Sequence, residues 1–271
     1  MQLIIDQECI FNSVGKQCFT LHPSSNALVN IINFAGKNVL NGRPRLPDVS
    51  SLCACADEIC SQIDSLDLSQ TYIQYAGVSD IPFIFLAVNK LKEKGMQLND
   101  IGLWHNFREP YSKLNGWHLL EEGKRDDSNA KFIECTTHTA LQKPAGDCER
   151  RVITFASSSK IYYEDLIGMP VERYSTHMFE AKQIHRDAIM NKKVAIWYAE
   201  RLKASIMSLK CDEVHLALAV SVPMAFCIAY ILLEHTYLPR IVIYHYEKQN
   251  RVKRPWGIEF SASGYKITQS S

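Results

Sequence analysis

Four short polar turns hold the residues of this sequence that are best suited to bind an anion. Each follows an apolar run and precedes a predicted helix or turn: His22-Pro23-Ser24-Ser25, Ser79-Asp80-Ile81-Pro82, Ser157-Ser158-Ser159-Lys160 and Ser221-Val222-Pro223. Hydroxyl groups and the free backbone N–H groups of a helix N-terminus together bind phosphate. Ser and Asp also cap helices of every kind. For one turn capping is the simpler explanation, whereas four turns at equivalent places make a shared ligand groove as good an explanation.

Aromatic and basic residues that could complete such a groove lie close by in the sequence. The aromatic side chains occur in or just after two strand-like runs, at Trp104, Phe107, Tyr244 and Tyr246. Nucleobases stack on such side chains, and a strand packed in a core also uses them. A basic run lies beside Trp256, at Lys248, Arg251, Lys253 and Arg254. It is either a solvated loop or a source of counter-charge for phosphate.

The common signatures of enzymes and metal sites are absent from the sequence. It contains no GxxxxGK[ST], GxGxxG, GxSxG or HExxH motif. Cys53 and Cys60 lack a matching Cys/His pair and share an apolar helical face, which favours buried thiols over zinc. Asp165 with Glu180-Ala181-Lys182 is only a loose nuclease-like spacing. His105 and His245 could act as bases, but such histidines more often make structural or ligand hydrogen bonds. We therefore assign no catalytic and no metal-binding residue.

The elements that would position these turns occur twice in the same order. Each copy is predicted to run helix, strand, polar turn, apolar helix and strand, followed by a tryptophan. The ranges are 49–66, 71–75, 83–91 and 101–107 in the first copy, and 190–209, 214–220, 221–233 and 241–246 in the second. The matching pairs are Pro82 with Pro223, Trp104 with Tyr244, His105 with His245, and Trp117 with Trp256.

An upstream correspondence extends the repeat. Residues 19–25 resemble residues 153–159, since each reads as a strand that ends in a serine-rich turn. Strands that alternate with helices predict an α/β fold in which parallel sheets are covered by helices. The match rests on the order of elements, because few residues are identical. We expect one lobe in residues 1–120, a polar linker or excursion in 121–150, and a second lobe in 151–271, with a frayed serine-rich tail after Phe260.

The apolar run 214–233 is long enough to cross a bilayer and carries no charge. The other interpretation is a buried strand, a turn at Ser221, and a buried helix with Pro223 in its first turn, where proline is tolerated. The equivalent helix of the first copy carries Lys90 and Lys92, which do not suit a bilayer. We therefore expect no membrane span.

The composition indicates a globular, cytoplasmic protein. The chain has 271 residues, 46% hydrophobic and 22% charged, with a net charge of +1. These values exclude a disordered chain and a collagen-like repeat, and the charge argues against a binder of duplex DNA. Nine cysteines without framework spacing indicate reduced thiols. The start MQLIIDQECIF lacks the basic and long apolar regions of a signal peptide.

Residues 152–260 resemble the SAVED domain of bacterial antiphage signalling. The resemblance rests on RVITFASSSKIYYEDL, KKVAIWYAERLKASI, EVHLALAVSVPMAFCIAYIL, and RIVIYHYEK with the following Trp256. SAVED domains are similar to two fused CARF-like lobes. The resemblance implies two Rossmann-like (CARF-like) lobes, pseudo-duplicated, that bind a cyclic oligonucleotide, typically a tri- or tetranucleotide, between them.

The resemblance and the polar turns together define a candidate ligand site and a function. We expect a sensor that activates a separate effector protein or assembles into a homo-oligomer or head-to-tail filament, as in CBASS or CRISPR defence. The alternatives are a ring nuclease that cleaves the cyclic oligonucleotide and a scaffold subunit without a ligand. No cofactor, duplex DNA or membrane partner is expected. The candidate ligand-binding residues are His22, Ser24, Ser25, Ser79, Asp80, Trp104, His105, Ser157, Ser158, Ser159, Lys160, Ser221, Val222, Pro223, Met224, Tyr244, His245, Tyr246, Arg254 and Trp256.

Overall fold

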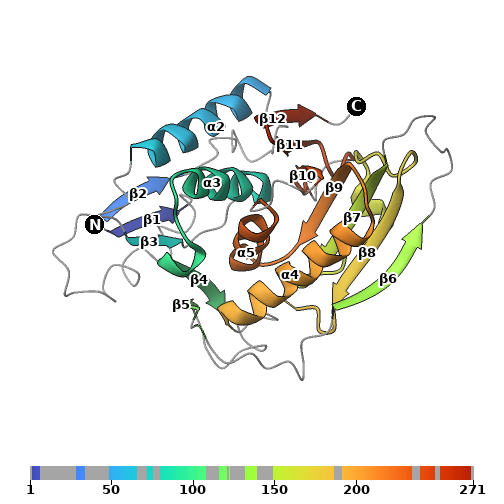
Figure 1. The fold of residues 1–271 in the computed structure, drawn as a ribbon, viewed down its shortest axis with the longest axis horizontal. Helices are drawn as coiled ribbons and strands as arrows, with labels where there is room; N and C mark the ends of the chain where they lie inside the picture. Colours follow the sequence, from blue (N-terminus) through green and yellow to red (C-terminus); the bar gives the residue numbers. More distant parts are fainter. Residues whose placement is uncertain are drawn as a thin grey trace.

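The fold consists of two sheets with helices between them (Figure 1). It is taken from a computed structural model of the chain. The structure describes residues 2–6, 29–33, 49–65, 72–75, 80–107, 116–120, 122, 132–138, 149–185, 191–233, 239–247 and 251–269. All structural statements below concern these residues.

The first half of the chain forms a five-stranded sheet in the order β2-β1-β3-β4-β5. Strands β1 to β4 are parallel, and β5 pairs antiparallel with β4. The strands are β1 (Gln2–Asp6), β2 (Val29–Asn33), β3 (Tyr72–Tyr75), β4 (Ile101–Phe107) and β5 (Gly116–Leu119).

The second half forms a seven-stranded sheet in the order β12-β11-β10-β9-β7-β8-β6. Its four middle strands are parallel, and β6, β11 and β12 are antiparallel. The strands are β6 (Phe132–His138), β7 (Arg150–Ala156), β8 (Ser175–Ala181), β9 (Glu213–Ala219), β10 (Arg240–Tyr244), β11 (Trp256–Ser261) and β12 (Gly264–Gln269).

The two sheets share one topology, so the predicted duplication and α/β fold are confirmed. The order β2-β1-β3-β4-β5 matches β8-β7-β9-β10-β11, including the antiparallel last strand that carries Trp117 or Trp256. In the first sheet, β1 (Gln2–Asp6) takes the place that β7 has in the second, because β1 pairs with β3 as β7 pairs with β9. Residues 19–25, which were predicted to correspond to 153–159, lie outside the described residues.

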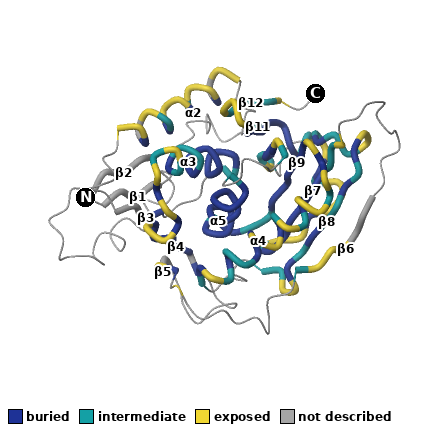
Figure 2. Tube along the Cα trace, viewed as in Figure 1, coloured by how far each residue is buried: buried dark blue, intermediate teal, exposed yellow. Residues whose placement is uncertain are grey.

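Among the described residues, four helices lie between and around the sheets: α2 (Val49–Asp64), α3 (Ile81–Glu93), α4 (Lys192–Ser208) and α5 (Val222–Leu232). Helices α3 and α5 pack against each other at the centre of the molecule, where Figure 2 shows the deepest burial. Helix α3 also reaches the sheet of the other half, since Phe83 lies 5.2 Å from Trp256 between ring centroids. Both halves therefore share one apolar core.

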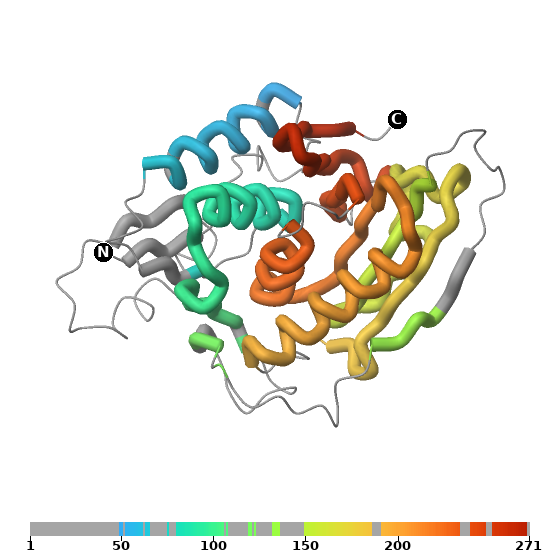
Figure 3. The backbone as a smooth tube through the Cα atoms, viewed as in Figure 1, coloured from blue at the N-terminus to red at the C-terminus, as the bar shows by residue number. Residues whose placement is uncertain are grey.

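A helix of the first half also contacts the last hairpin of the second half. Helix α2 from the first half lies beside the hairpin β11–β12 at the end of the second (Figure 3). The thiol of Cys60 lies 3.6 Å from the hydroxyl of Tyr265, which belongs to β12. The tail after Phe260 was expected to fray, and this prediction was wrong: the alternating Tyr265 and Ile267 pack partly against the core.

The long apolar run forms a strand and a helix, as predicted. Strand β9 ends at Ala219, and α5 begins after Ser221 with Pro223 in its first turn. Parallel strands covered on both faces are continuously apolar, which accounts for the composition of β9. Among the described residues, no helix is long and apolar enough to span a membrane.

The described residues also form two short 3₁₀ helices: η1 (Leu98–Asp100) before β4, and η2 (Tyr163–Leu166) between β7 and β8. Strand β6 lies inside the segment 121–150 that was predicted as a linker or excursion, and it forms the edge of the second sheet. The predicted lobe boundaries at 120 and 151 stay a prediction.

Candidate functional site

A pocket with a volume of about 320 Å³ lies where the parallel strands β7, β9 and β10 end. Ligands of open α/β sheets bind at this edge, beyond the carboxyl ends of the strands. The first turn of α3 closes the pocket from the other half of the chain. The lining residues are Asp80, Ile81, Ser158, Ser159, Lys160, Ile161, Asp165, Leu218, Ala219, Val220, Val222, His245, Tyr246 and Arg254.

The serine turn after β7 is fixed to the end of β9. The backbone N–H groups of Ser157 and Ser158 both donate to the carbonyl oxygen of Ala219, at 3.0 Å each. The hydroxyls of Ser157, Ser158 and Ser221 are buried, and within the part of the chain that the structure describes none has a hydrogen-bond partner. Buried hydroxyls are usually paired, so these three indicate a place where water or a ligand completes the site.

The two helices that point at this edge begin without a side-chain cap. Asp80 precedes α3 and Ser221 precedes α5, and neither side chain accepts a hydrogen bond from the first turn of its helix. Pro82 and Pro223 occupy the first turns and lack an N–H group. Simple capping, the alternative left open by the sequence, is therefore not what these two side chains do.

His245 joins the halves at the rim of the pocket. Its Nδ1 lies 3.3 Å from Oδ1 of Asp80, and its Nε2 lies 3.7 Å from Oε2 of Glu247. Its ring stacks on Trp256 with 5.0 Å between centroids and 17° between planes. Burial raises the pKa of Asp80, and the neighbouring His245 opposes that shift. The imidazole thus sits between two carboxylates in a fixed orientation.

Arg254 supplies a buried positive charge. Its side chain is only 1% exposed, its Nε donates to the carbonyl of Asp165 at 3.1 Å, and its guanidinium lies 4.7 Å from the ring centroid of Tyr246. Burial lowers the pKa of Arg254 to about 10, so the group stays charged at neutral pH. The hydroxyl of Tyr246 donates to Oδ1 of Asp165 at 2.8 Å. Arg254, Tyr246 and Asp165 form one connected wall.

The structure brings together eight of the predicted residues at the pocket: Asp80, Ser158, Ser159, Lys160, Val222, His245, Tyr246 and Arg254. Five more predicted residues are buried behind the lining. Four of them adjoin the lining turns in sequence, and the fifth stacks on His245: Ser157, Ser221, Pro223, Met224 and Trp256. Trp104 and His105 are buried within β4 and do not line the pocket. His22, Ser24, Ser25 and Ser79 lie outside the described residues.

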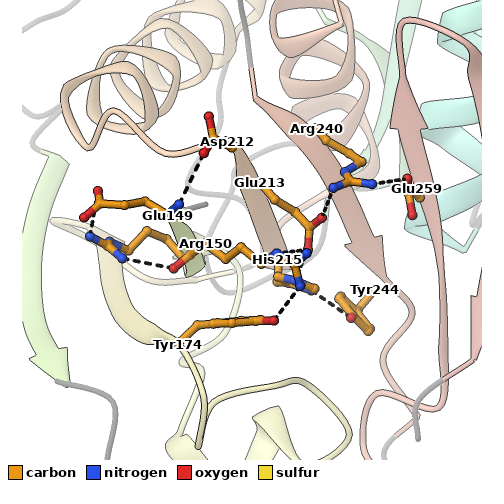
Figure 4. Close-up of polar contacts among 10 residues, drawn as sticks. Glu149, Arg150, Tyr174, Asp212, Glu213, His215, Arg240, Tyr244 and Glu259 are labelled. Carbon is orange, nitrogen blue, oxygen red and sulfur yellow. Dashed lines mark hydrogen bonds and ion pairs between the residues drawn. The ribbon is translucent and has the colours of Figure 1, made fainter. Parts of the chain in front are cut away.

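Tyr244 faces the other side of the sheet. Its hydroxyl lies 2.9 Å from Nδ1 of His215, in a polar cluster with Glu213, Arg240 and Tyr174 (Figure 4). Successive side chains of a strand point to opposite faces, so Tyr244 cannot share the face of Ile243 and the adjoining His245. The prediction that Tyr244 binds the ligand was made from its position at the strand end, and the alternation of side chains along the strand explains why Tyr244 lies elsewhere.

Sequence reasoning missed six lining residues, most of them apolar. Ile81, Ile161 and the end of β9 carry no chemical signal of their own, although their position beside the polar turns could have indicated them. Asp165 was noticed only as part of a nuclease-like spacing. Its partner Glu180 belongs to β8 and does not line the pocket.

Solved structures share this fold, whereas no protein-family model and no curated protein matches the sequence. A Cap4 SAVED/CARF-domain receptor from Acinetobacter baumannii, solved with the cyclic trinucleotide 2'3'3'-cAAA, has a TM-score of 0.58 at 11% identity. The same receptor with 3'3'3'-cAAA gives 0.54 at 12% identity, and that from Moraxella osloensis gives 0.51 at 11%. Each match covers 99% of this chain. It covers 51% of the Acinetobacter baumannii receptor chain in both complexes and 49% of the Moraxella osloensis receptor chain. This chain thus spans about half of their length, and over that length it has the fold of the SAVED/CARF-domain receptors.

Proposed function

We propose that this chain is a SAVED-type receptor that binds a cyclic oligonucleotide, a cyclic tri- or tetranucleotide, in the pocket between its halves. The observation that carries the proposal is the pocket itself, which both halves build at the ends of parallel strands. The likeness in fold to receptors solved with cyclic trinucleotides supports the choice of ligand. A separate effector protein, or assembly into an oligomer or filament, would then transmit the signal in antiviral defence.

The lining residues suit one nucleotide unit of such a ligand. A volume of about 320 Å³ is at the lower end of the range of roughly 300–1,000 Å³ for small-molecule sites. Lys160 and Arg254 supply positive charge for a phosphate, and the hydroxyl of Ser158, which has no partner among the described residues, supplies a donor. The bound unit would touch the first turn of α3 from one half and the turn after β7 from the other. Binding would therefore favour one packing of the halves over others.

The proposal predicts saturable binding of a cyclic trinucleotide to the isolated chain. Calorimetric titration with 3'3'3'-cAAA and 2'3'3'-cAAA is expected to give heat with at least one of them, and linear ApApA is the control. Chromatography of the recovered ligand then separates the alternatives: an intact cyclic molecule supports sensing, and a cleaved one supports the ring nuclease. No heat with either ligand would contradict a cyclic trinucleotide as the ligand, and no heat with a cyclic tetranucleotide as well would contradict the proposal and favour a scaffold subunit.

The proposal also predicts a role for Lys160, an exposed cation at the pocket. Lys160→Ala removes one hydrogen bond to a charged group, which contributes about 1.5–3 kcal/mol, so cyclic trinucleotide binding is expected to weaken by about tenfold or more. Lys266→Ala, at an exposed position on β12 away from the pocket, is the matched control. Equal affinities of the two variants for the cyclic trinucleotide would mean that its phosphates do not bind at Lys160.

A further inference from the structure

The carboxylate of Asp80 is the one acidic group of the described pocket lining that keeps an oxygen for a ligand. Each oxygen of Asp165 already accepts a hydrogen bond, because Tyr246 donates to Oδ1 at 2.8 Å and the backbone N–H of Tyr162 donates to Oδ2 at 2.9 Å. In Asp80, His245 faces Oδ1 at 3.3 Å. Within the described part of the chain, no hydrogen bond or ion pair reaches its Oδ2, and the side chain is 43% exposed.

The environment of Asp80 makes it an acceptor for a ligand donor and a poor neighbour for phosphate. A carboxylate accepts hydrogen bonds and repels a phosphate. At the equivalent position before α5 the chain has Ser221, whose buried hydroxyl is unpaired among the described residues. The two halves thus present different chemistry to the same pocket: the serine turn with Lys160 on one side, and a carboxylate on the other.

The orientation of Asp80 is held by a chain of contacts outside the pocket. His245 stacks on Trp256, and Trp256 packs against Phe83 in the first turns of α3. The backbone N–H of Phe83 donates to the carbonyl oxygen of Asp80 at 2.9 Å. With its carbonyl bonded to α3 and Oδ1 facing His245, the free Oδ2 has a defined place at the pocket wall.

From these contacts we infer that Asp80 reads a nucleobase, by accepting a hydrogen bond from its exocyclic amino group at Oδ2. This rests on the proposed function and names the specificity residue of the same site. An amino-bearing base such as adenine offers a donor, whereas hypoxanthine places a carbonyl oxygen there and is repelled by the carboxylate. The pocket therefore prefers an adenine-containing ligand over the inosine-containing ligand of the same size and charge.

The experiment compares 3'3'3'-cAAA with the otherwise identical cyclic tri-inosine ligand by calorimetry. The wild-type chain is expected to bind the adenine ligand at least about tenfold more tightly, from the roughly 1–3 kcal/mol that a good base contact gives. Asp80→Asn is expected to reduce this ratio to near one, because the amide can rotate to donate to the carbonyl oxygen. Glu259→Gln is the matched control, since Glu259 pairs with Arg240 and does not line the pocket.

Three outcomes decide the inference. A preference that Asp80→Asn removes and Glu259→Gln keeps would support it. Equal binding of both ligands by the wild-type chain, or an unchanged ratio in Asp80→Asn, would overturn it while the proposed function stands. Binding of neither ligand would contradict the proposed function itself, and the inference would fall with it. The wild-type comparison needs no variant, so a misfolded Asp80→Asn would not prevent a decision.

Discussion

Gly168→Ala is expected to destabilise the fold by about 3 kcal/mol and to weaken cyclic trinucleotide binding more than tenfold. Gly168 has φ +104°, a conformation that costs a residue with a Cβ about 1–3 kcal/mol. A Cβ at this position would also lie 2.5 Å from the carbonyl oxygen of Arg254 and 2.7 Å from a side-chain carbon of Val252. The segment that carries Arg254 must therefore shift, and Arg254 is part of the pocket wall.

Gly264→Ala provides the matched control, because it has the same backbone strain without the contact. Gly264 has φ +116°, and a Cβ there would meet no described atom within 4 Å. Urea unfolding of both variants should show the larger loss for Gly168→Ala, and only that variant should lose affinity in calorimetry. Equal losses of stability and unchanged binding in both would show that the close approach of residue 168 to Arg254 does not position the site.

The second half of the fold was predictable from sequence because its elements are long and strongly patterned. Residues 214–232, which hold all of β9 after Glu213 and all of α5, form one uncharged run, and the turn signal within it, Ser221 with Pro223, marks the boundary correctly. In the first half, β1 has only five residues, and its pairing with β2 and β3 depends on contacts distant in sequence. Local patterning favoured residues 19–21 in its place, since they precede a serine-rich turn.

The sequence predicts those residues of the candidate site that follow directly after the parallel strands, but not the others. Residues that follow parallel strands meet at one edge by topology, which placed Ser158, Ser159 and His245 together. The face of the sheet to which a side chain points depends on its place in the alternation along the strand, and this alternation directs Tyr244 away from the pocket. Asp165 and Arg254 meet through a loop contact, and no periodicity in the sequence encodes such a contact.

The polar cluster on the far face of the sheet explains what holds Tyr244 (Figure 4). Glu213 is buried, with Oε1 at 2.8 Å from Nε2 of His215 and Oε2 at 2.7 Å from Arg240. His215 bridges Glu213 and Tyr244, because its other ring nitrogen, Nδ1, lies 2.9 Å from the hydroxyl of Tyr244. The hydrogen bond to His215, together with nearby arginines, lowers the pKa of Glu213 below its ordinary value of 4.5.

Glu213→Gln is therefore expected to destabilise the fold by about 2–3 kcal/mol at pH 7. Breaking a fully buried ion pair costs about 3–5 kcal/mol, and Arg240 is partly exposed and can be rehydrated, which reduces the loss. Glu259→Gln, which removes the more exposed partner of Arg240, should cost about 0.5 kcal/mol or less. Urea unfolding of the three proteins at pH 7 measures both values.

The same pair predicts how stability depends on pH. Because the folded pKa of Glu213 lies below the unfolded one, its contribution is present above about pH 4.5 and is lost as the pH falls through the folded pKa. The difference in unfolding free energy between the wild type and Glu213→Gln should therefore shrink as the pH falls below about 4.5. The difference for Glu259→Gln should stay small throughout. A Glu213→Gln difference that is unchanged at pH 4 would mean that the loss comes from packing, and that the charge of Glu213 does not stabilise the cluster around His215.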